Sequence, residues 1–286
     1  MPKVAYEVLD PEKRTSCVVF ASPHSGRDYP DSFLRSTVLD AKEIRSSEDA
    51  FVDQLFAIAP KFGAPLLKAG APRAFIDLNR SAEELDPAVI EGVRRQGHNP
   101  RISSGLGVVP RVVANGRAIY RGKITMQEAD RRIERYWKPY HAMLQTLLEG
   151  AQQYHGQAIL IDCHSMPHEA MDGMSRGAKT RPDIVLGDRF GAAAGSTVMD
   201  QVEAAFASAG FNVVRNAPFA GAYIAQAYGR PSHNQHTIQV EIDRSLYMNE
   251  RLIRPNADFE SVRDRLRSVI EDVSSIGQVR MPLAAE

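Results

Sequence analysis

The chain has 286 residues, of which 43% are hydrophobic and 24% are charged, a composition typical of soluble globular proteins. Lys plus Arg and Asp plus Glu each total 35, so no net charge is available to recruit nucleic acid or an anionic membrane surface. The composition therefore predicts neither a nucleic-acid partner nor a membrane partner, and it leaves the oligomeric state open.

The first ten residues, the apolar runs and the cysteines bear on the cellular compartment. The first ten residues, MPKVAYEVLD, lack the apolar core of a secretory signal, and no apolar run approaches the roughly 18 residues of a spanning helix. Cys17 and Cys163 both lie in apolar runs, which predicts buried thiols and no disulfide framework. We therefore expect a cytoplasmic protein, with residues 1–286 forming a single domain.

The first third of the chain predicts strands and one helix. An apolar run predicts a strand at 16–22, and apolar side chains at three-to-four spacing predict a helix from about 40 to 62. Gly63 is the expected C-cap of that helix. Short strands are expected at 64–69 and 73–78.

A segment without clean periodicity follows. Residues 81–122 are rich in Gly, Pro, Arg and Asn, which predicts a loop-rich excursion over the sheet. Thr125 and Glu128 then form a capping-box pattern that begins the longest predicted helix, which extends to about Tyr154.

The remaining elements alternate between strand and helix. Strands are expected at 157–163, 183–188, 211–216 and 236–245, and helices at 196–209 and 258–274. This alternation predicts an α/β fold with a mixed, mostly parallel sheet between layers of helices.

Two histidines stand at the ends of strongly apolar runs. His24 lies in CVVFASPHSG and His164 in AILIDCHSM. Ligands bind at the carboxyl ends of strands in parallel sheets, so the two similar phrases predict a metal or acid–base site at one sheet edge. A single histidine of this kind could equally cap a turn through the serine and glycine beside it.

A metal held by two histidines needs a third ligand, usually an imidazole or a carboxylate. Glu48, Asp49 and Asp53 lie nearby in SSEDAFVDQLF. These carboxylates could instead complement the macrodipole at the start of the predicted helix, so the residues alone do not choose among them.

Glu241 is a further candidate for chemistry. It lies on the strand face opposite Ile238, Val240 and Ile242. A buried Glu has a raised pKa and could serve as general base and acid, although a salt bridge with Arg244 is the alternative.

Several basic side chains could bind an anionic substrate. Arg80 follows the predicted strand IDL directly, where its guanidinium could hold a carboxylate in a bidentate pair. Solvated surface positions are the alternative for each arginine, and turn capping is the alternative for the histidines of RPSHNQH. The candidates are Arg73, Arg80, Arg121, Arg181, Arg244, His233 and His236.

Several common catalytic motifs are absent from the sequence. It contains no GxSxG elbow, no GxxxxGK[ST] loop, no GxGxxG after a strand, no HExxH and no CxxC pair.

Six phrases occur in an order that resembles one family. They are SPHSGRDYP, SSEDAFVDQLF, FIDLNRS, LIDCHSM, RPDIVLGDRFG and QVEIDRSLYM. Together they resemble the N-formylglutamate amidohydrolases, also called N-formylglutamate deformylases, from about residue 16 to about 275. The resemblance implies a three-layer sandwich of the phosphorylase/hydrolase-like type, specifically zinc-carboxypeptidase-like, and one divalent metal ion, expected to be zinc.

The resemblance also implies a ligand set. His24 and His164 match metal ligands, and Asp49 matches the carboxylate ligand better than Glu48 does. The His-x-x-Glu pair of carboxypeptidases is absent, because Arg27 stands three residues after His24.

Glu241 matches the general base of this fold, and Arg80 matches the arginine that receives a substrate carboxylate. Arg121 and Arg181 are expected to assist Arg80, with Arg244 and His233 as further substrate-binding candidates. The implied reaction is hydrolysis of N-formyl-L-glutamate to formate and L-glutamate. The alternatives are a zinc peptidase of the same fold that acts on a peptide or cell-wall fragment, and a non-catalytic binder of a small acidic ligand.

Overall fold

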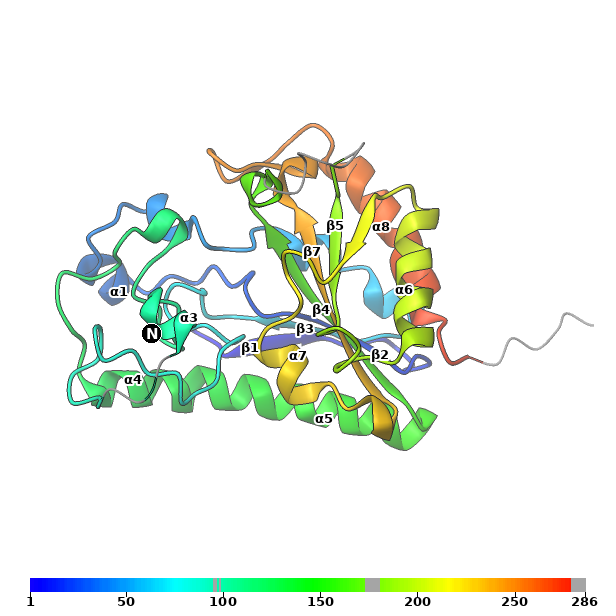
Figure 1. The fold of residues 1–286 in the computed structure, drawn as a ribbon, viewed down its shortest axis with the longest axis horizontal. Helices are drawn as coiled ribbons and strands as arrows, with labels where there is room; N and C mark the ends of the chain where they lie inside the picture. The colour runs from blue at the N-terminus through cyan, green and yellow to red at the C-terminus, as the bar shows by residue number, and fades with distance from the viewer. Residues whose placement is uncertain (95–96, 98, 173–180, 279–286) are drawn as a thin grey trace, which may run out of the picture.

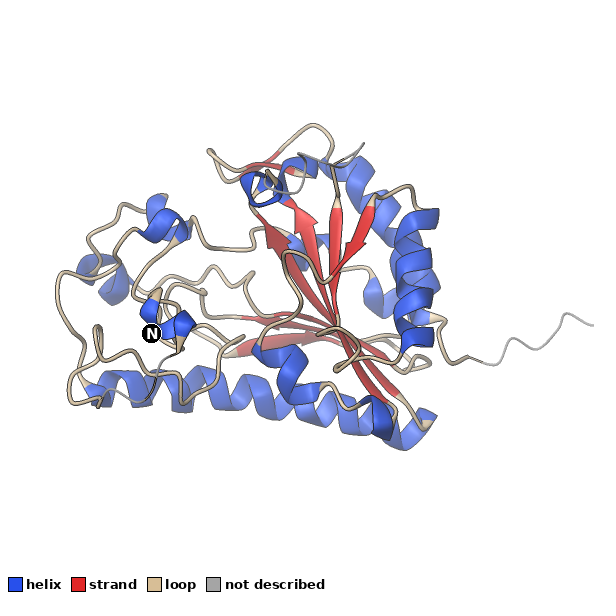
Figure 2. Ribbon diagram, in the orientation of Figure 1, coloured by secondary structure: helices blue, strands red, loops and turns tan. Residues whose placement is uncertain are grey.

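A seven-stranded sheet with strand order β1-β3-β2-β4-β7-β5-β6 forms the centre of the computed structural model (Figures 1 and 2). The structure describes residues 1–94, 97, 99–172 and 181–278. Its strands are β1 (Tyr6–Leu9), β2 (Val18–Ser22), β3 (Leu66–Ala69), β4 (Ala158–Met166), β5 (Ile184–Gly187), β6 (Val213–Arg215) and β7 (Gln235–Asp243). A separate two-stranded sheet pairs β8 (Met248–Asn249) with β9 (Arg254–Pro255).

The four central strands β3, β2, β4 and β7 are parallel. At one edge β1 is antiparallel to β3, and at the other β5 is antiparallel to β7 while β6 is parallel to β5. The predicted mixed, mostly parallel sheet is confirmed. The carboxyl ends of the central strands consequently meet at one edge, where side chains from distant parts of the sequence can converge.

Helices cover both faces of the sheet. The long α5 (Lys138–His155) lies on one side, and α6 (Ser196–Ser208) and α8 (Phe259–Ser274) lie on the other (Figure 1). Alternate residues of β2 serve the two cores, because Val18 and Phe20 belong to the cluster with α6 and α8, whereas Val19 belongs to the cluster with α5. The remaining helices are α1 (Asp31–Ser36), α2 (Val52–Leu55), α3 (Pro100–Ser103), α4 (Met126–Arg132) and α7 (Tyr223–Tyr228).

Most predicted elements are confirmed within a few residues, including the long helix after Thr125. The Thr125 side chain accepts a hydrogen bond from the Glu128 backbone N–H at 3.2 Å. The helix continues from α4 through a π-helical turn, Ile133–Trp137, into α5. Cys17 and Cys163 are buried free thiols, as predicted. Among the described residues, no helix has the length and apolarity required to cross a membrane.

Two predicted elements are wrong. The helix expected at 40–62 is broken into short pieces, namely a 3-10 turn at Glu43–Arg45, α2 and a 3-10 turn at Ala59–Phe62, with Phe51 at a left-handed φ of 68°. Residues 73–78 form no strand, because side chains of the long helix bind the carbonyls of this segment in place of a neighbouring strand. The short edge strand β1 gives too weak an apolar pattern to be predicted.

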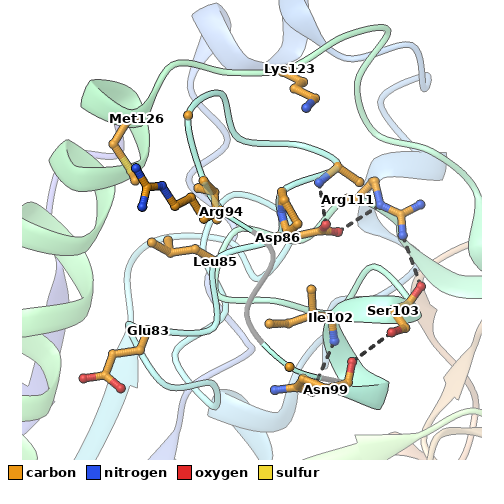
Figure 3. A pocket seen from close by; sticks show the side chains of 15 residues that line it. Glu83, Leu85, Asp86, Arg94, Asn99, Ile102, Ser103, Arg111, Lys123 and Met126 are labelled. Atoms are coloured by element: carbon orange, nitrogen blue, oxygen red, sulfur yellow. Dashed lines mark hydrogen bonds and ion pairs between the residues drawn. The ribbon is translucent and has the colours of Figure 1, made fainter.

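The described residues of the segment 81–122 lie mostly in loops and turns, and polar contacts connect them. Figure 3 shows a pocket within it, where Arg111 Nε lies 2.9 Å from Asp86 Oδ2 and Arg111 also donates to the Ser103 carbonyl at 3.3 Å. The Asn99 side chain caps α3 by accepting from the backbone N–H groups of Arg101 and Ile102.

Buried His141 predicts an acid-dependent loss of stability. Burial lowers its pKa from the usual 6.5 to about 4. The neutral ring is therefore favoured in the folded protein. The resulting contribution to the free energy of unfolding is complete above pH 6.5 and is lost as the pH falls toward 4. We expect it to be worth about 3 kcal/mol at most.

Urea unfolding of the wild type and of His141→Gln at pH 7.5 and pH 5 tests this expectation. The free energy of unfolding should fall less in the variant on acidification, since Gln does not titrate. Equal pH dependence in the two proteins would contradict it.

Candidate active site

Three buried side chains meet at the carboxyl ends of the central strands. His24 follows β2, His164 lies near the end of β4, and Asp49 lies in the bend before α2. His164 Nδ1 is 3.1 Å from His24 Nδ1 and 3.0 Å from Asp49 Oδ2, and His24 Nδ1 is 3.4 Å from the same oxygen. The three donor atoms thus point at one another, as expected of side chains that surround an ion.

The opposite ring nitrogens of both histidines contact carboxylates. His24 Nε2 lies 2.7 Å from Asp77 Oδ1, and His164 Nε2 lies 2.9 Å from Asp162 Oδ2. A carboxylate can only accept, so each Nε2 carries a proton, and Nδ1 is the ring nitrogen that faces Asp49 and would face a bound ion. This is the carboxylate–histidine pairing that supports metal-bound histidines in proteins.

Asp49 is held ionised with one oxygen directed at the histidines. Arg244 Nη2 donates to Asp49 Oδ1 at 2.9 Å, and the Ser165 hydroxyl donates to the same oxygen at 3.3 Å. Burial raises the pKa of Asp49, but hydrogen bonds from His164 and His24 and the charge of Arg244 outweigh it and hold that pKa well below its usual range. Oδ2 therefore remains available as an anionic ligand.

These residues fit a divalent metal ion. Two imidazole nitrogens and one carboxylate oxygen lie within 4.8 Å of one another, which is a donor set typical of catalytic zinc with an open fourth position. His24 comes from just after the end of β2, His164 from β4, and Asp49 from the bend before α2. The sequence predicts that the two histidines meet at one edge of the sheet.

Glu241 lies beside this cluster on β7, directly opposite His164 in the β4–β7 register. Burial is the main cause that raises its pKa to about 7, and the charge of Asp49 adds to it, while His164, Arg73 and Arg244 oppose it. Its Oε1 accepts a hydrogen bond from Gln239 Nε2 at 2.8 Å. Such a group can both accept and release a proton near neutral pH.

A cavity of about 430 Å³ lies over these groups. Its polar floor includes the three candidate metal ligands and Glu241, and the excursion at 81–122 supplies an apolar wall. That wall includes Leu106, Pro110, Val112 and Val113. The volume lies within the range of small-molecule sites.

Three arginines line the cavity, and they have different partners. Arg73 Nε lies 3.1 Å from Asp77 Oδ2, and Arg244 binds Asp49. Arg80 donates through Nε to the Leu106 carbonyl at 2.8 Å and through Nη1 to the Asn79 carbonyl at 2.7 Å. The guanidinium of Arg80 is thus held by carbonyls, and among the described residues no carboxylate forms an ion pair with it.

The structure does not bring the other candidates into this cluster. Glu48 is bound bidentately by Arg45, because the broken helix turns Glu48 away while it turns Asp49 inward. Arg181 pairs with Asp172 outside the cavity lining. Arg121 and His233 are exposed and do not line the cavity either.

Sequence reasoning did not single out several residues that support the site. Asp162 precedes His164 by two residues and Gln239 precedes Glu241 by two, so the two-residue period of a strand could have placed each pair on one face. Asp77 and Asn79 offer no such signal, because they lie on a segment without regular structure that only the tertiary fold places beside the histidines.

The α/β sheet gathers these polar groups at the carboxyl ends of its central strands, the place where enzymes of α/β architecture bind their substrates. The family model described as N-formylglutamate amidohydrolase matches residues 16–248, and the chain belongs to this family.

Individual relatives agree with this assignment. The chain is 28% identical over 284 residues to an N-formylglutamate deformylase of Pseudomonas aeruginosa, covering 96% of this chain and 98% of that protein. A crystal structure of an N-formylglutamate amidohydrolase from Ralstonia eutropha JMP134 is 34% identical with a TM-score of 0.87, covering 94% of this chain and 97% of that one. A protein from Agrobacterium tumefaciens shares the fold at 14% identity and a TM-score of 0.66, covering 96% and 95% of the two chains.

Proposed function

We propose that the protein hydrolyses the formyl amide of N-formyl-L-glutamate, releasing formate and L-glutamate, in a metal-dependent reaction. The family and the activities for which its relatives are named support the substrate. The observation that carries the chemistry is the cluster of His24, Asp49 and His164 with Glu241 beside it in one cavity.

We expect His24, Asp49 and His164 to hold a zinc ion. A bound divalent ion supplies Lewis acidity, which makes a water molecule more acidic and polarises a carbonyl. Asp77 and Asp162 keep the two imidazoles oriented, and Arg244 keeps Asp49 oriented.

Glu241 is the proposed proton carrier. It takes a proton from the attacking water as the new C–O bond forms at the formyl carbon, and it gives that proton to the amide nitrogen as the C–N bond breaks. Its pKa of about 7 suits both halves of this transfer. The product amine leaves as glutamate and the acyl group leaves as formate.

The cavity arginines are the proposed binding groups for the two carboxylates of the substrate. Arg80 is the principal one, since carbonyls fix its guanidinium and no carboxylate in the described part of the chain forms an ion pair with it. Arg244 and Arg73 add positive charge to the same cavity, although each already holds a carboxylate of the site.

Removal and restoration of the metal tests the proposal. Chelation should abolish release of formate from N-formyl-L-glutamate, and stoichiometric zinc should restore it. Zinc should also raise the unfolding temperature of the chelated protein, since a ligand that binds only the folded state stabilises it.

A substrate panel completes the test. N-formyl-L-glutamate should be turned over faster than other N-acyl amino acids and short peptides. Faster turnover of peptides would instead support a peptidase, and a protein without metal and without turnover would support a binding protein.

A further inference from the structure

Three side chains of the long helix donate to backbone carbonyls of one cavity segment, residues 75–80. Arg132 Nη1 donates to the Phe75 carbonyl at 3.0 Å. His141 Nε2 lies 2.9 Å from the Leu78 carbonyl, and Trp137 Nε1 donates to the Arg80 carbonyl at 2.8 Å. This segment has no strand pairing, so the helix supplies the donors that a neighbouring strand would otherwise provide.

The π-helical turn brings these three donors onto one side of the helix. Residues five apart in an α-helix lie about 140° apart around its axis, so Arg132 and Trp137 would face different ways. The turn at Ile133–Trp137 accommodates one extra residue, which moves Trp137 to the place of an i+4 neighbour of Arg132. His141 then follows Trp137 by a normal four residues.

The segment held in this way carries much of the site. Asp77 contacts the ring of His24, and Arg80 is the proposed carboxylate receptor. Asn79 lies between them, and its side-chain oxygen accepts from the Ile224 backbone N–H of α7 at 2.7 Å. A small movement of the segment would displace all three side chains together.

A second contact from α7 fixes His141 itself. The Leu78 carbonyl can only accept, so His141 Nε2 carries the proton and His141 Nδ1 accepts from the Tyr228 hydroxyl at 2.9 Å. Trp137 packs against the same ring, with centroids 4.0 Å apart. Neither Trp137 nor His141 lines the cavity.

We propose that Trp137 and His141 are positioning residues, which act on substrate binding only through the backbone of residues 78–80. The inference rests on the proposed function for its substrate. The indole N–H of Trp137 donates to the Arg80 carbonyl, so the proposal predicts that loss of this N–H disturbs the guanidinium of Arg80.

The Trp137→Phe variant tests the inference, because Phe keeps the aromatic contact with His141 and lacks the donor. The KM for N-formyl-L-glutamate should rise roughly threefold to tenfold, with kcat within about twofold, as expected when one hydrogen bond that orders a binding group is lost. In an Arg80→Lys background the same substitution should leave KM unchanged, since the two residues act in series.

Tyrosine variants provide a matched comparison. Tyr228→Phe removes the hydroxyl that binds His141 and should also raise KM. Tyr140→Phe removes a buried hydroxyl of the same helix that has no hydrogen-bond partner among the described residues, and it should leave KM unchanged.

Hydrogen exchange gives a readout without turnover. Backbone amides at 77–81 should exchange faster in Trp137→Phe than in the wild type, whereas amides of β4 should not change. An unchanged KM, an equal rise in KM in the Arg80→Lys background, or unchanged exchange would each overturn the inference. Absence of wild-type turnover would instead refute the proposed function, and the exchange comparison would still decide on positioning.

Discussion

Replacing Glu241 by Gln should lower kcat for N-formyl-L-glutamate by about 10²- to 10⁴-fold, the usual contribution of a general acid–base group. Three carboxyl groups line the cavity, those of Asp49, Asp77 and Glu241. For the two aspartates, contacts with histidine and arginine overcome the effect of burial and hold the pKa well below the usual range, so both stay ionised. Of the three, only Glu241 has a raised pKa, which is about 7.

The substitution is chosen to remove proton transfer and little else. Gln has nearly the shape of Glu, and its side-chain oxygen can still accept the hydrogen bond from Gln239. Asp243→Asn is the matched control, because Asp243 is buried on the same strand two residues further and pairs with His168 outside the cavity lining.

Steady-state kinetics and metal content should be measured on both variants. We expect Glu241→Gln to keep its metal and lose kcat, and Asp243→Asn to retain both. Wild-type kcat in Glu241→Gln would exclude Glu241 as the proton carrier, and loss of metal in that variant would show a different role for this side chain.

The sheet was predictable because its central strands are buried on both faces. Residues 16–22 and 157–163 are near-continuous apolar runs, and burial of every residue of β2 and β4 is the physical counterpart of that pattern. Residues 73–78 have a similar composition but no strand neighbour. Their partners are side chains some 60 residues further along the chain, at Arg132 and His141, and no local pattern carries that information.

The candidate site was predictable to a similar degree. The position of a histidine at a strand end follows from local sequence, so the sequence was sufficient to place His24 and His164 in one candidate site. The choice between Glu48 and Asp49 depends on a bend in which Phe51 adopts a left-handed conformation. The apolar residues across 40–62 recur with the period of a continuous helix, so the sequence does not indicate this bend. Asp77 is a site residue that the sequence does not indicate, because its contact with His24 spans 53 residues and depends on an irregular segment.

Replacing Asp162 by Asn should weaken metal binding by about 10- to 100-fold, the usual effect of altering the partner of a metal-bound histidine. Asp162 Oδ2 lies 2.9 Å from His164 Nε2, and its negative charge makes the imidazole a stronger donor through Nδ1. Asn keeps the size of the side chain and can still accept a hydrogen bond, but it removes the charge. Competition with a chelator of known zinc affinity measures the change.

Asp188→Asn provides the control for this substitution. Asp188 is also buried, but it binds Asn216 and does not line the cavity, so its replacement should leave zinc affinity unchanged. Urea unfolding of the metal-free proteins separates two roles of Asp162, since a purely structural role would lower the free energy of unfolding and leave zinc affinity at the wild-type value. Such a result would contradict the view that Asp162 supports His164 as a metal ligand. A selective loss of zinc affinity would instead show that Asp162 and His164 act together in metal binding. The two-residue period of β4 would then place the metal ligand and its hydrogen-bond partner on the same face of the strand.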